Sequence, residues 1–428
     1  MHIFFSGIGG TAIGPLALLA KQAGYEVSGS DKQHSLYIDN LRKQGITNIH
    51  IGQETQDIAS VHAERPIDWY VYSSAVSIEN PDAPELVFCR EQKIRMSKRD
   101  ELLNEIIAQK RLKLIAIAGT HGKTTTTAMA VWLCQEIGLP VSYTLAAKTS
   151  FADMAHYDEN AEYFLYECDE YDRNFLHFSP HLSLITGIDW DHPDIFPTRQ
   201  TYLGAFQTFI DQSNAVFLWE SDAQQLGLAN TGNIRVLPDD DETIQTITLP
   251  GEVNRANAWQ VAQSLQSIAR KPVPELLDVL QRFPGVSRRF ERIASGLYSD
   301  YAHTPPKIRG ALQLGHEVAG GNLVVVYEGL HNTRQHFIRD ELSTLFETVK
   351  HLYIVPSYLA REDETLELLT PEKLRSLLSE TTQAKTTPCT LNSSLREAIH
   401  HHVAQGDTVL CLTAGGGNSL DEWLRQEF

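Results

Sequence analysis

The chain has 428 residues, of which 42% are apolar and 21% charged, a balance typical of a globular protein with two or three domains. Its 54 Asp and Glu residues outnumber its 36 Lys and Arg residues, and the resulting net charge of −18 excludes a general affinity for nucleic acid. No apolar run is long enough to cross a membrane, and the N-terminus lacks the basic start of a signal peptide. The five cysteines form no CxxC pair, so we expect a cytoplasmic protein.

Short apolar runs alternate with helical patterns along the whole chain, which predicts an α/β fold with parallel or mixed sheets. A strongly helical stretch from Lys98 to Arg111 separates the first such unit from the second, and Pro284-Gly285 precedes the third. We therefore expect three domains, formed by residues 1–97, 98–286 and 287–428.

The first strand, Ile3 to Ser6, leads into a glycine turn, and a second strand ends near Asp31. Gly7, Gly9 and Ala12 fit the G-x-G-x-x-G/A pattern of a diphosphate-binding turn, in which an acidic residue after the second strand holds a ribose hydroxyl. The same geometry suits NAD and a sugar nucleotide equally well. The pattern therefore predicts a diphosphate ligand and leaves its identity open.

The strongest signal is an apolar strand, residues 112–118, that leads into a Gly-Thr-His-Gly-Lys-Thr-Thr turn and then a helix. Backbone N–H groups at a helix start attract phosphate, Lys123 would reach the β and γ phosphates, and the Thr124 hydroxyl would bind magnesium. Ile117 replaces the glycine that a P-loop has six residues before its lysine. We predict a nucleotide-binding loop, rather than a structural turn, made of Gly119, Thr120, His121, Gly122, Lys123, Thr124 and Thr125.

Two acidic segments follow later apolar strands. Glu167 lies in a run of acidic residues at the end of the strand that begins at Tyr163, and His192 follows Asp191 after the next strand. Carboxylates at the carboxyl edge of an open sheet are placed to bind Mg²⁺ together with phosphate oxygens. The alternative for the acidic run is a solvated loop, and for His192 a structural role.

Farther along, Asn254 and Asn257 lie one turn apart on the same face of a predicted helix, and Arg288 and Arg289 follow the Pro-Gly pair. The alternative for the asparagines is a helix cap and a surface group, and for the arginines a solvated pair.

A third polar segment, Asp300, Tyr301 and His303, comes just after a predicted strand and should therefore also lie at a sheet edge. The alternative is a simple turn. His400, His401 and His402 lie within a helical pattern, and we expect no metal site there.

Taken in order, these residues resemble the Mur ligase family over essentially the whole chain. The similarity is carried by Gly7 to Gly10, Ser28 to Asp31, Ser73 to Ala75, Asn80-Pro81, Ala118 to Thr127, Glu167 to Glu170, Asp191-His192, Asn254 to Asn257, Arg288 to Glu291 and Asp300 to His303. The resemblance implies a Rossmann-like N-terminal domain for a UDP-sugar, a central P-loop ATPase domain, and a Rossmann-like C-terminal domain that closes over ATP and an amino acid.

The resemblance also implies a role for each candidate residue. Catalysis would fall to Lys123, His192, Arg289, Asp300 and His303; nucleotide binding to Gly119 through Thr125 with Asn254, Asn257 and Arg288; UDP-sugar binding to Gly9, Gly10, Asp31, Ser73, Ser74 and Tyr301; and metal binding to Thr124, Glu167 and His192.

The set is most similar to the alanine-adding members of the family, which implies UDP-N-acetylmuramate and L-alanine as substrates with ATP and Mg²⁺. The related recycling ligases, which attach a preformed tripeptide to UDP-N-acetylmuramate, are the alternative. Leu330-His331-Asn332 and Val253 depart from the family pattern, so no role is transferred to them. We expect a monomer or a weak homodimer.

Two further hypotheses belong to other classes of protein: a nicotinamide-dependent dehydrogenase built on the first domain, and a nucleotide-binding regulator without catalysis. The first leaves the Gly119 to Thr125 loop unexplained. The second is disfavoured by the joint presence of Lys123, Glu167, His192 and Asp300. If the chain is a ligase, either Asp300 or His303 could accept the proton of the incoming amine.

Overall fold

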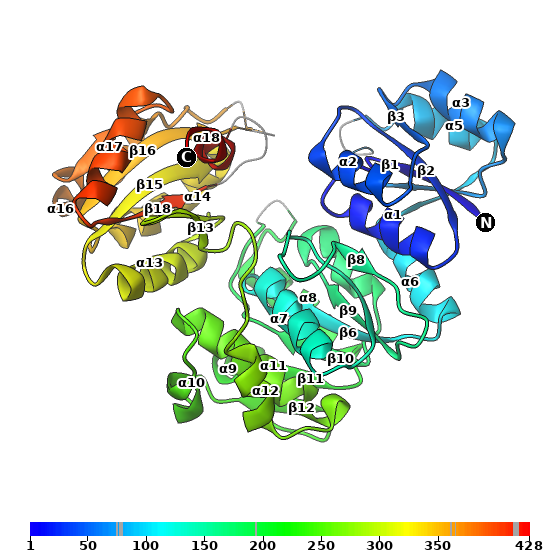
Figure 1. The fold of residues 1–428 in the computed structure, drawn as a ribbon, viewed down its shortest axis with the longest axis horizontal. Coiled ribbons are helices and arrows are strands. Elements are labelled where there is room, and N and C mark those ends of the chain that lie inside the picture. The colour runs from blue at the N-terminus through cyan, green and yellow to red at the C-terminus, as the bar shows by residue number, and fades with distance from the viewer. Residues whose placement is uncertain (74–75, 77–79, 193–194, 360–361, 364, 414–418) are drawn as a thin grey trace. The chain divides into compact units, whose positions relative to one another are not determined.

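The computed structural model describes residues 1–73, 76, 80–192, 195–359, 362–363, 365–413 and 419–428. The chain divides into two compact units, residues 1–241 with 257–283, and residues 242–256 with 284–428. The first unit contains two sheets and the second contains one (Figure 1). This architecture confirms the predicted α/β class, while the domain limits at residues 97 and 286 stay predictions.

The first sheet is wholly parallel, with the strand order β3-β2-β1-β4-β5. Its strands are β1 (His2–Ser6), β2 (Glu26–Asp31), β3 (Ile49–Ile51), β4 (Trp69–Tyr72) and β5 (Arg95–Lys98), and its helices are α1 (Ile13–Gln22), α2 (Leu36–Lys43), α3 (Thr55–Glu64), α5 (Pro84–Glu91) and α6 (Arg99–Gln109). Lys98, expected in a helix, ends β5 instead, because it pairs with Tyr72 of β4. β1 lies in the middle of the sheet, as its fully buried residues require.

The second sheet has the order β12-β11-β10-β6-β9-β7-β8, and its described strands run parallel except for the β7-β8 pair. Its strands are β6 (Lys113–Ala118), β7 (Val141–Thr144), β8 (Ala155–His156), β9 (Tyr163–Glu167), β10 (Leu182–Ile185), β11 (Val216–Trp219) and β12 (Ile234–Leu237). The helices of this part are α7 (Lys123–Glu136), the 3₁₀ helix η1 (Tyr171–His177), α8 (Arg199–Asp211), α9 (Glu220–Leu226) and α12 (Val273–Leu280). The carboxyl ends of β6, β9 and β10 therefore meet at one edge.

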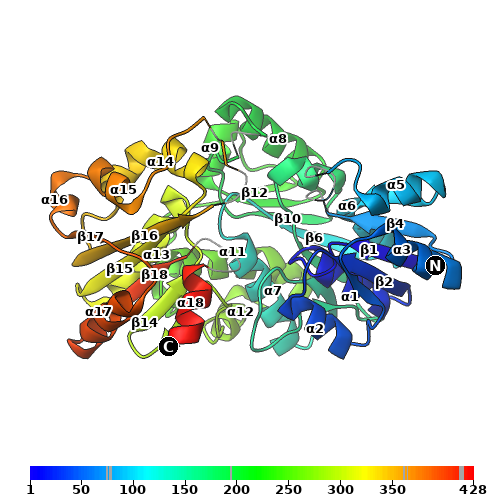
Figure 2. The ribbon, with the colours of Figure 1, turned by 90° about the horizontal axis from the view of Figure 1, so that it is seen from above.

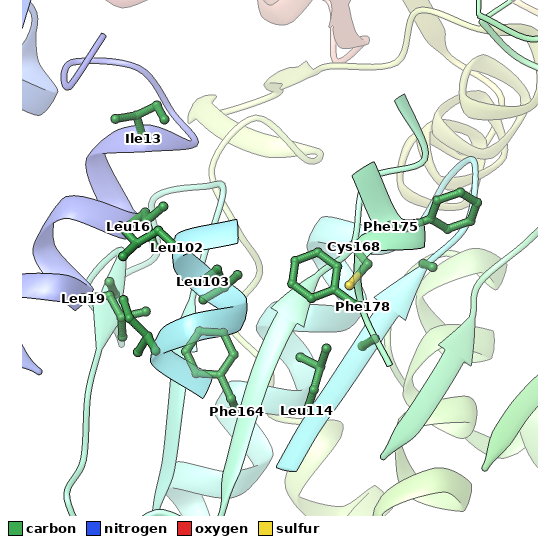
Figure 3. Packing of buried hydrophobic residues seen from close by; sticks show 14 of the residues in the cluster. Ile13, Leu16, Leu19, Leu102, Leu103, Leu114, Phe164, Cys168, Phe175 and Phe178 are labelled. Atoms are coloured by element: carbon green, nitrogen blue, oxygen red, sulfur yellow. The ribbon is translucent and has the colours of Figure 1, made fainter. Parts of the chain in front are cut away.

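A single apolar core joins the two sheets of the first unit. Leu16 and Leu19 of α1 and Leu103 of α6 belong to the same buried cluster as Phe164 of β9 and Leu114 of β6 (Figure 3). Because α1 and α6 present apolar side chains at helical spacing, each covers the first sheet and also contributes to the core of the second. The first sheet thus shares a core with the second through α1 and α6.

The third sheet, in the second unit, has the order β13-β14-β18-β15-β16-β17. Its strands are β13 (Glu291–Ala294), β14 (Leu297–Asp300), β15 (Leu323–Leu330), β16 (His351–Tyr358), β17 (Thr386–Pro388) and β18 (Thr408–Leu412), and only β13 is antiparallel to its neighbour. The helices are α10 (Glu242–Thr246), α13 (Pro305–Ala319), α14 (Asn332–Leu345), α15 (Pro371–Leu377), α16 (Glu380–Gln383), α17 (Ser393–Ala404) and α18 (Leu420–Glu427), while α11 (Glu252–Ala269) runs from this unit into the first.

Helices cover both faces of the third sheet (Figure 2). Successive residues of β15 alternate between two apolar clusters: Val325 packs with α13, α14 and α15, and Val324 packs with α17 and α18. None of the helices in the described part of the chain is long and apolar enough to span a membrane.

Candidate active site

The predicted phosphate loop connects β6 to α7 and is shaped by two glycines with left-handed or related backbone angles. Gly119 has φ +140°, and a Cβ there would lie 2.5 Å from Thr186 Oγ1 of the segment after β10. Gly122 caps α7 with φ +80°, and a Cβ there would lie 3.2 Å from Asn257 Oδ1. Side chains are thus disfavoured at both positions, and the amides at the start of α7 are left for an anion.

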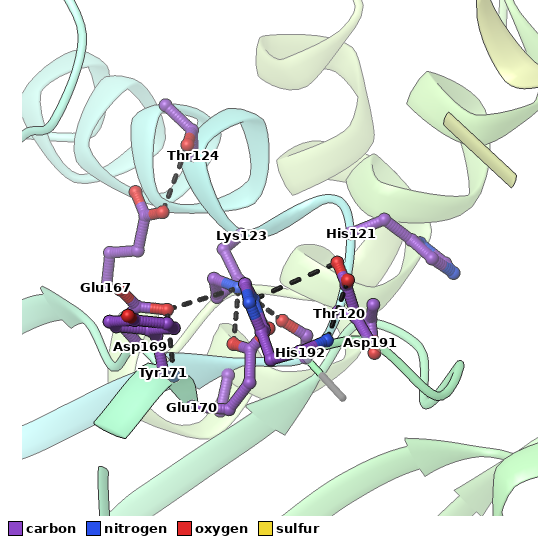
Figure 4. Close-up of polar contacts among 12 residues, drawn as sticks. Thr120, His121, Lys123, Thr124, Glu167, Asp169, Glu170, Tyr171, Asp191 and His192 are labelled. Carbon is purple, nitrogen blue, oxygen red and sulfur yellow. Dashed lines mark hydrogen bonds and ion pairs between the residues drawn. The ribbon is translucent and has the colours of Figure 1, made fainter. Parts of the chain in front are cut away.

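Lys123, the first residue of α7, turns back across the loop. Its ammonium donates to the carbonyl of Gly119 at 2.5 Å and to Glu170 Oε2 at 2.5 Å, and it lies 3.9 Å from Asp169 Oδ1 (Figure 4). Burial disfavours the charged ammonium, but Glu170, Asp169 and Glu167 outweigh burial and raise the pKa of Lys123. The lysine therefore stays a cation at neutral pH.

The predicted metal residues separate into two places. Thr124 Oγ1 donates to Glu167 Oε1 at 3.1 Å, so these two oxygen ligands are adjacent (Figure 4). His192 Nε2 instead lies 3.7 Å from Glu170 Oε1 and 3.8 Å from Asp191 Oδ2. Within the described residues, no three His, Cys, Asp or Glu side chains form a group that could hold a metal ion. A hydroxyl and a carboxylate beside a phosphate loop nevertheless fit Mg²⁺, which takes most of its ligands from phosphate and water.

The other residues of the loop are tied to the edge of the sheet. Thr120 Oγ1 donates to the Asp189 carbonyl at 2.7 Å, and His121 Nε2 lies 2.8 Å from Asp189 Oδ2. Thr186 Oγ1 donates to the carbonyl of His121. These contacts fix the loop from the β10 side, through Asp189 and Thr186, two residues that the sequence does not assign to the site.

The two predicted asparagines of α11 have different surroundings. Asn254 Nδ2 donates to the carbonyl of Pro250 at 2.9 Å and belongs to the second unit. Asn257 is buried in the first unit beside Gly122. Of the two asparagines, Asn257 is the one that lies beside the phosphate loop within the first unit.

The glycine turn of the first sheet is organised by Asp31 at the end of β2. Gly9 N donates to Asp31 Oδ2 at 2.8 Å, and Gly10 N donates to the carbonyl of Gly7 at 3.0 Å. A Cβ on Gly7 would lie 3.3 Å from Ser73 Oγ, so Ser73 adjoins the same turn. The structure thus brings Gly9, Gly10, Asp31 and Ser73 together. Ser74 lies outside the described residues.

In the second unit, the predicted residues gather where β14 ends. Asp300 Oδ2 accepts from Phe290 N at 2.8 Å, and burial, partly offset by Arg289, raises the pKa of Asp300 to about 6. The guanidinium carbons of Arg288 and Arg289 lie 4.4 and 5.3 Å from the centre of the Tyr301 ring. A carboxylate and two cations therefore share one edge of the third sheet.

His303 lies in the same cluster. Its Nδ1 is 2.9 Å from the Tyr301 carbonyl, and its ring packs edge-on against the Tyr301 ring at 4.7 Å. Because a carbonyl only accepts hydrogen bonds, Nδ1 carries the proton, and in the neutral ring Nε2 is the basic nitrogen.

One residue of the histidine triplet, His402, makes hydrogen bonds near the end of α17. His402 Nδ1 bonds Asp407 Oδ2 at 2.8 Å, and His402 Nε2 bonds Tyr353 OH at 3.0 Å. Both ring nitrogens of His402 are therefore hydrogen-bonded to other side chains.

A strand, a glycine turn with an embedded lysine, and adjacent acidic residues define a nucleotide-dependent α/β enzyme. Comparison with known families agrees with this class. Residues 2–111 match the "Mur ligase family, catalytic domain", residues 117–237 match the "Mur ligase middle domain", and residues 288–415 match the "Mur ligase, glutamate ligase domain". The chain belongs to the Mur ligase family, whose members are ATP-dependent ligases that form a C–N bond.

Curated relatives are similar over most of their length. A UDP-N-acetylmuramate–L-alanine ligase of Nocardioides sp. is 30% identical over 86% of this chain and 83% of the relative, and one of Renibacterium salmoninarum is 29% identical over 97% and 93%. These matches favour a ligase over the dehydrogenase hypothesis for the first domain.

Solved structures share the fold. The UDP-N-acetylmuramate-alanine ligase of Thermotoga maritima superposes with a TM-score of 0.76 at 20% identity, covering 100% of this chain and 98% of that one. A murein peptide ligase of Psychrobacter arcticus superposes with a TM-score of 0.64 at 21% identity, covering 100% and 97%.

Proposed function

We propose that this protein joins L-alanine to the lactyl carboxylate of UDP-N-acetylmuramate, with ATP converted to ADP and phosphate, in the cytoplasm and as a monomer or weak homodimer. The observation that carries the proposal is the Lys123 ammonium set among Glu170, Asp169 and the loop carbonyl of Gly119. The names of the similar curated relatives support the choice of substrates.

The chemistry requires activation because a carboxylate oxygen is a poor leaving group. Transfer of the γ-phosphoryl group to the lactyl carboxylate makes an acyl phosphate, whose phosphate leaves readily when an amine attacks the carbonyl carbon. Negative charge gathers on the phosphoryl oxygens during transfer, and the Lys123 ammonium, with the amides of the α7 start, would stabilise that charge.

The residues that would hold Mg²⁺ are Thr124 and Glu167, whose side-chain oxygens lie 3.1 Å apart. When bound there, the ion would neutralise part of the phosphate charge. His192 would support the same edge through its contact with Glu170.

The amine step falls to the cluster at the end of β14. The amino group must be neutral to attack, and the ammonium form of a free amino acid prevails at pH 7. We propose that Asp300 holds the ammonium and that either Asp300 or His303 accepts its proton. Arg288 and Arg289 would bind the negative charges of the nucleotide and the acyl phosphate.

The UDP-sugar would bind at the turn of the first sheet, through Gly9, Gly10, Asp31 and Ser73. Asp31 already holds the turn in shape by accepting the amide of Gly9, and its carboxylate would also accept from a sugar hydroxyl.

The experiment measures ADP release with UDP-N-acetylmuramate and ATP against L-alanine, glycine, L-serine and the L-Ala-γ-D-Glu-diamino acid tripeptide. We expect L-alanine to have the highest kcat/KM, because a closed pocket for a small side chain excludes a larger nucleophile by steric clash. A tenfold preference for the tripeptide would reassign the protein to the recycling reaction. If none of the four releases ADP, the ligase proposal is wrong.

A further inference from the structure

Glu170 lies between the lysine of the phosphate loop and a histidine of the next strand's loop, and it is only 1% exposed. One carboxylate oxygen, Oε2, accepts from the Lys123 ammonium at 2.5 Å. The other, Oε1, lies 3.7 Å from His192 Nε2. A single buried carboxylate, which follows β9, therefore contacts both Lys123, which follows β6, and His192, which follows β10 on the other side of β6 in the sheet order.

The contact fixes the direction of the ammonium. A lysine ammonium has three N–H donors, and here the Gly119 carbonyl takes one and Glu170 another, each at 2.5 Å. With two donors held by groups of the protein, only one direction is left for a phosphate oxygen. Lys123 is thereby oriented before a nucleotide arrives, and a preoriented group loses less freedom during the reaction.

The same contact weakens the lysine as a general anchor for anions. Glu170 places a full negative charge against the ammonium inside the protein, where charges are poorly screened. A phosphate approaching Lys123 therefore meets a partly neutralised cation. Glu170 opposes binding of the nucleotide in its ground state while it maintains the geometry that the transfer needs.

We propose that Glu170 is a positioning residue for phosphoryl transfer, which orients Lys123 and keeps His192 at a set distance from it. The role differs from that of Glu167, whose contact is with the Thr124 hydroxyl. This inference rests on the proposed function in that ATP is taken as the phosphoryl donor. If Glu170 has this role, removing its charge should change ADP binding and turnover in opposite directions.

The test compares Glu170→Gln with the wild type in two assays: calorimetric binding of ADP with Mg²⁺, and kcat for ADP release under saturating substrates. The amide keeps the size of the side chain but not its charge. We expect kcat to fall at least about tenfold while ADP binds at least about threefold more tightly, because the free ammonium attracts phosphate more strongly. General damage to the site would weaken both.

Asp172→Asn is the matched control, because Asp172 belongs to the same acidic run but pairs with Lys98 at 2.7 Å. We expect both quantities to stay within about twofold of the wild type for this variant. Glu170→Asp keeps the charge but is too short to contact both Lys123 and His192, so it should bind ADP like the wild type and have a lower kcat.

A kcat of Glu170→Gln within tenfold of the wild type, or weaker binding of ADP, would overturn the inference. If that variant does not fold by circular dichroism, wild-type turnover of Glu170→Asp would overturn it instead. The ADP arm needs no acceptor substrate, so it still judges the role of Glu170 if every acceptor fails and the proposed function is wrong.

Discussion

Two glycine turns follow the middle strands of the first and second sheets, and they differ in the charge that organises them. In the first, the amide of Gly9 is bound by the carboxylate of Asp31, and the Gly7 to Gly10 segment contains no lysine. In the second, Lys123 lies across the loop and is held by Glu170. The glycine pattern thus predicts a turn at the end of a buried strand, whereas the charged side chains decide which ligand the turn can take.

The largest effect should come from removing the cation of the second turn. Lys123→Ala is expected to lower kcat at least about 100-fold, a loss of roughly 3 kcal/mol of transition-state stabilisation, because the ammonium faces charge that develops during transfer. The change in kcat is measured by steady-state ADP release. Lys113→Ala, at the exposed opposite end of β6, is the control and should behave like the wild type. If kcat of a folded Lys123→Ala protein falls by less than about fivefold, the charge of Lys123 does not distinguish the second turn from the first.

The carboxylate beside the second turn should govern the magnesium requirement. Glu167→Gln keeps the shape of a group that contacts Thr124 Oγ1 but removes its charge, so we expect half-saturation at about tenfold more Mg²⁺ and slower acyl phosphate formation. Binding of the UDP-sugar should hardly change. Glu162→Gln, at the exposed residue just before the same strand, is the matched control. An unchanged Mg²⁺ titration would show that the acidic run is a solvated loop and not a metal site.

A smaller effect, confined to one substrate, is expected at the first turn. Asp31→Asn can still accept the Gly9 amide, but it loses the charge that strengthens hydrogen bonds to the UDP-sugar. We expect KM for UDP-N-acetylmuramate to rise about tenfold and KM for ATP to stay the same. Asp39→Asn, an exposed partner of His34, serves as the control. Equal increases in both KM values would show that the two turns are not specialised as proposed.

The charges of the second turn should not produce the pH dependence at acidic pH. Burial works against both charges, but Glu170 and Asp169 raise the pKa of Lys123, while Lys123 and Arg99 lower the pKa of Asp169. At the site of the amine step, the carboxylate expected to titrate in this range is Asp300, whose pKa burial raises to about 6. Burial also raises the pKa of Asp222 to about 6, but Asp222 accepts from Ile188 N in the first unit and lies outside that site. Below that pH Asp300 becomes neutral and no longer attracts the ammonium of the amino acid.

This assignment is visible in a pH profile. Because the bound ammonium passes its proton to a group of the site, log kcat/KM for L-alanine should change little with pH just above pH 6, and protonation of Asp300 should give a slope of about one below pH 6. Asp300→Asn should have lower activity and no change of slope near pH 6. A wild-type profile without a change of slope near pH 6 would contradict the role of Asp300, provided that thermal unfolding shows the protein folded at each pH.

Much of the fold could be predicted because its central strands are mostly apolar and buried. The runs that contain β1, β6 and β15 are each buried by helices on both faces, and such strands have a sequence signature that needs no alignment. An edge strand such as β5, with the sequence Arg-Met-Ser-Lys, has no such signature, and its last residue, Lys98, is predicted from the sequence to begin a helix. Its pairing with β4 alone defines it.

The site was predictable where one residue type performs the chemistry, as for Lys123. It was not predictable within the acidic run, where Asp169, Glu170 and Asp172 are chemically alike. Their directions depend on the backbone after β9, which has left-handed angles at Asp172 and Arg173, so that one carboxylate contacts Lys123 and another contacts Lys98. The sequence contains no pattern that separates these carboxylates.

The shared core of α1, α6 and the second sheet has a consequence for how the protein unfolds. Leu16, Leu103 and Phe164 belong to one apolar cluster, so separating the first sheet would expose the core-facing side of both helices to water. The region that unfolds cooperatively is then larger than the region that binds one ligand. Calorimetry should record both sheets melting together, and a fragment ending at residue 97 should aggregate rather than fold alone. Binding of a UDP-sugar at the first turn would accordingly also protect the ATP-binding loop from heat and protease.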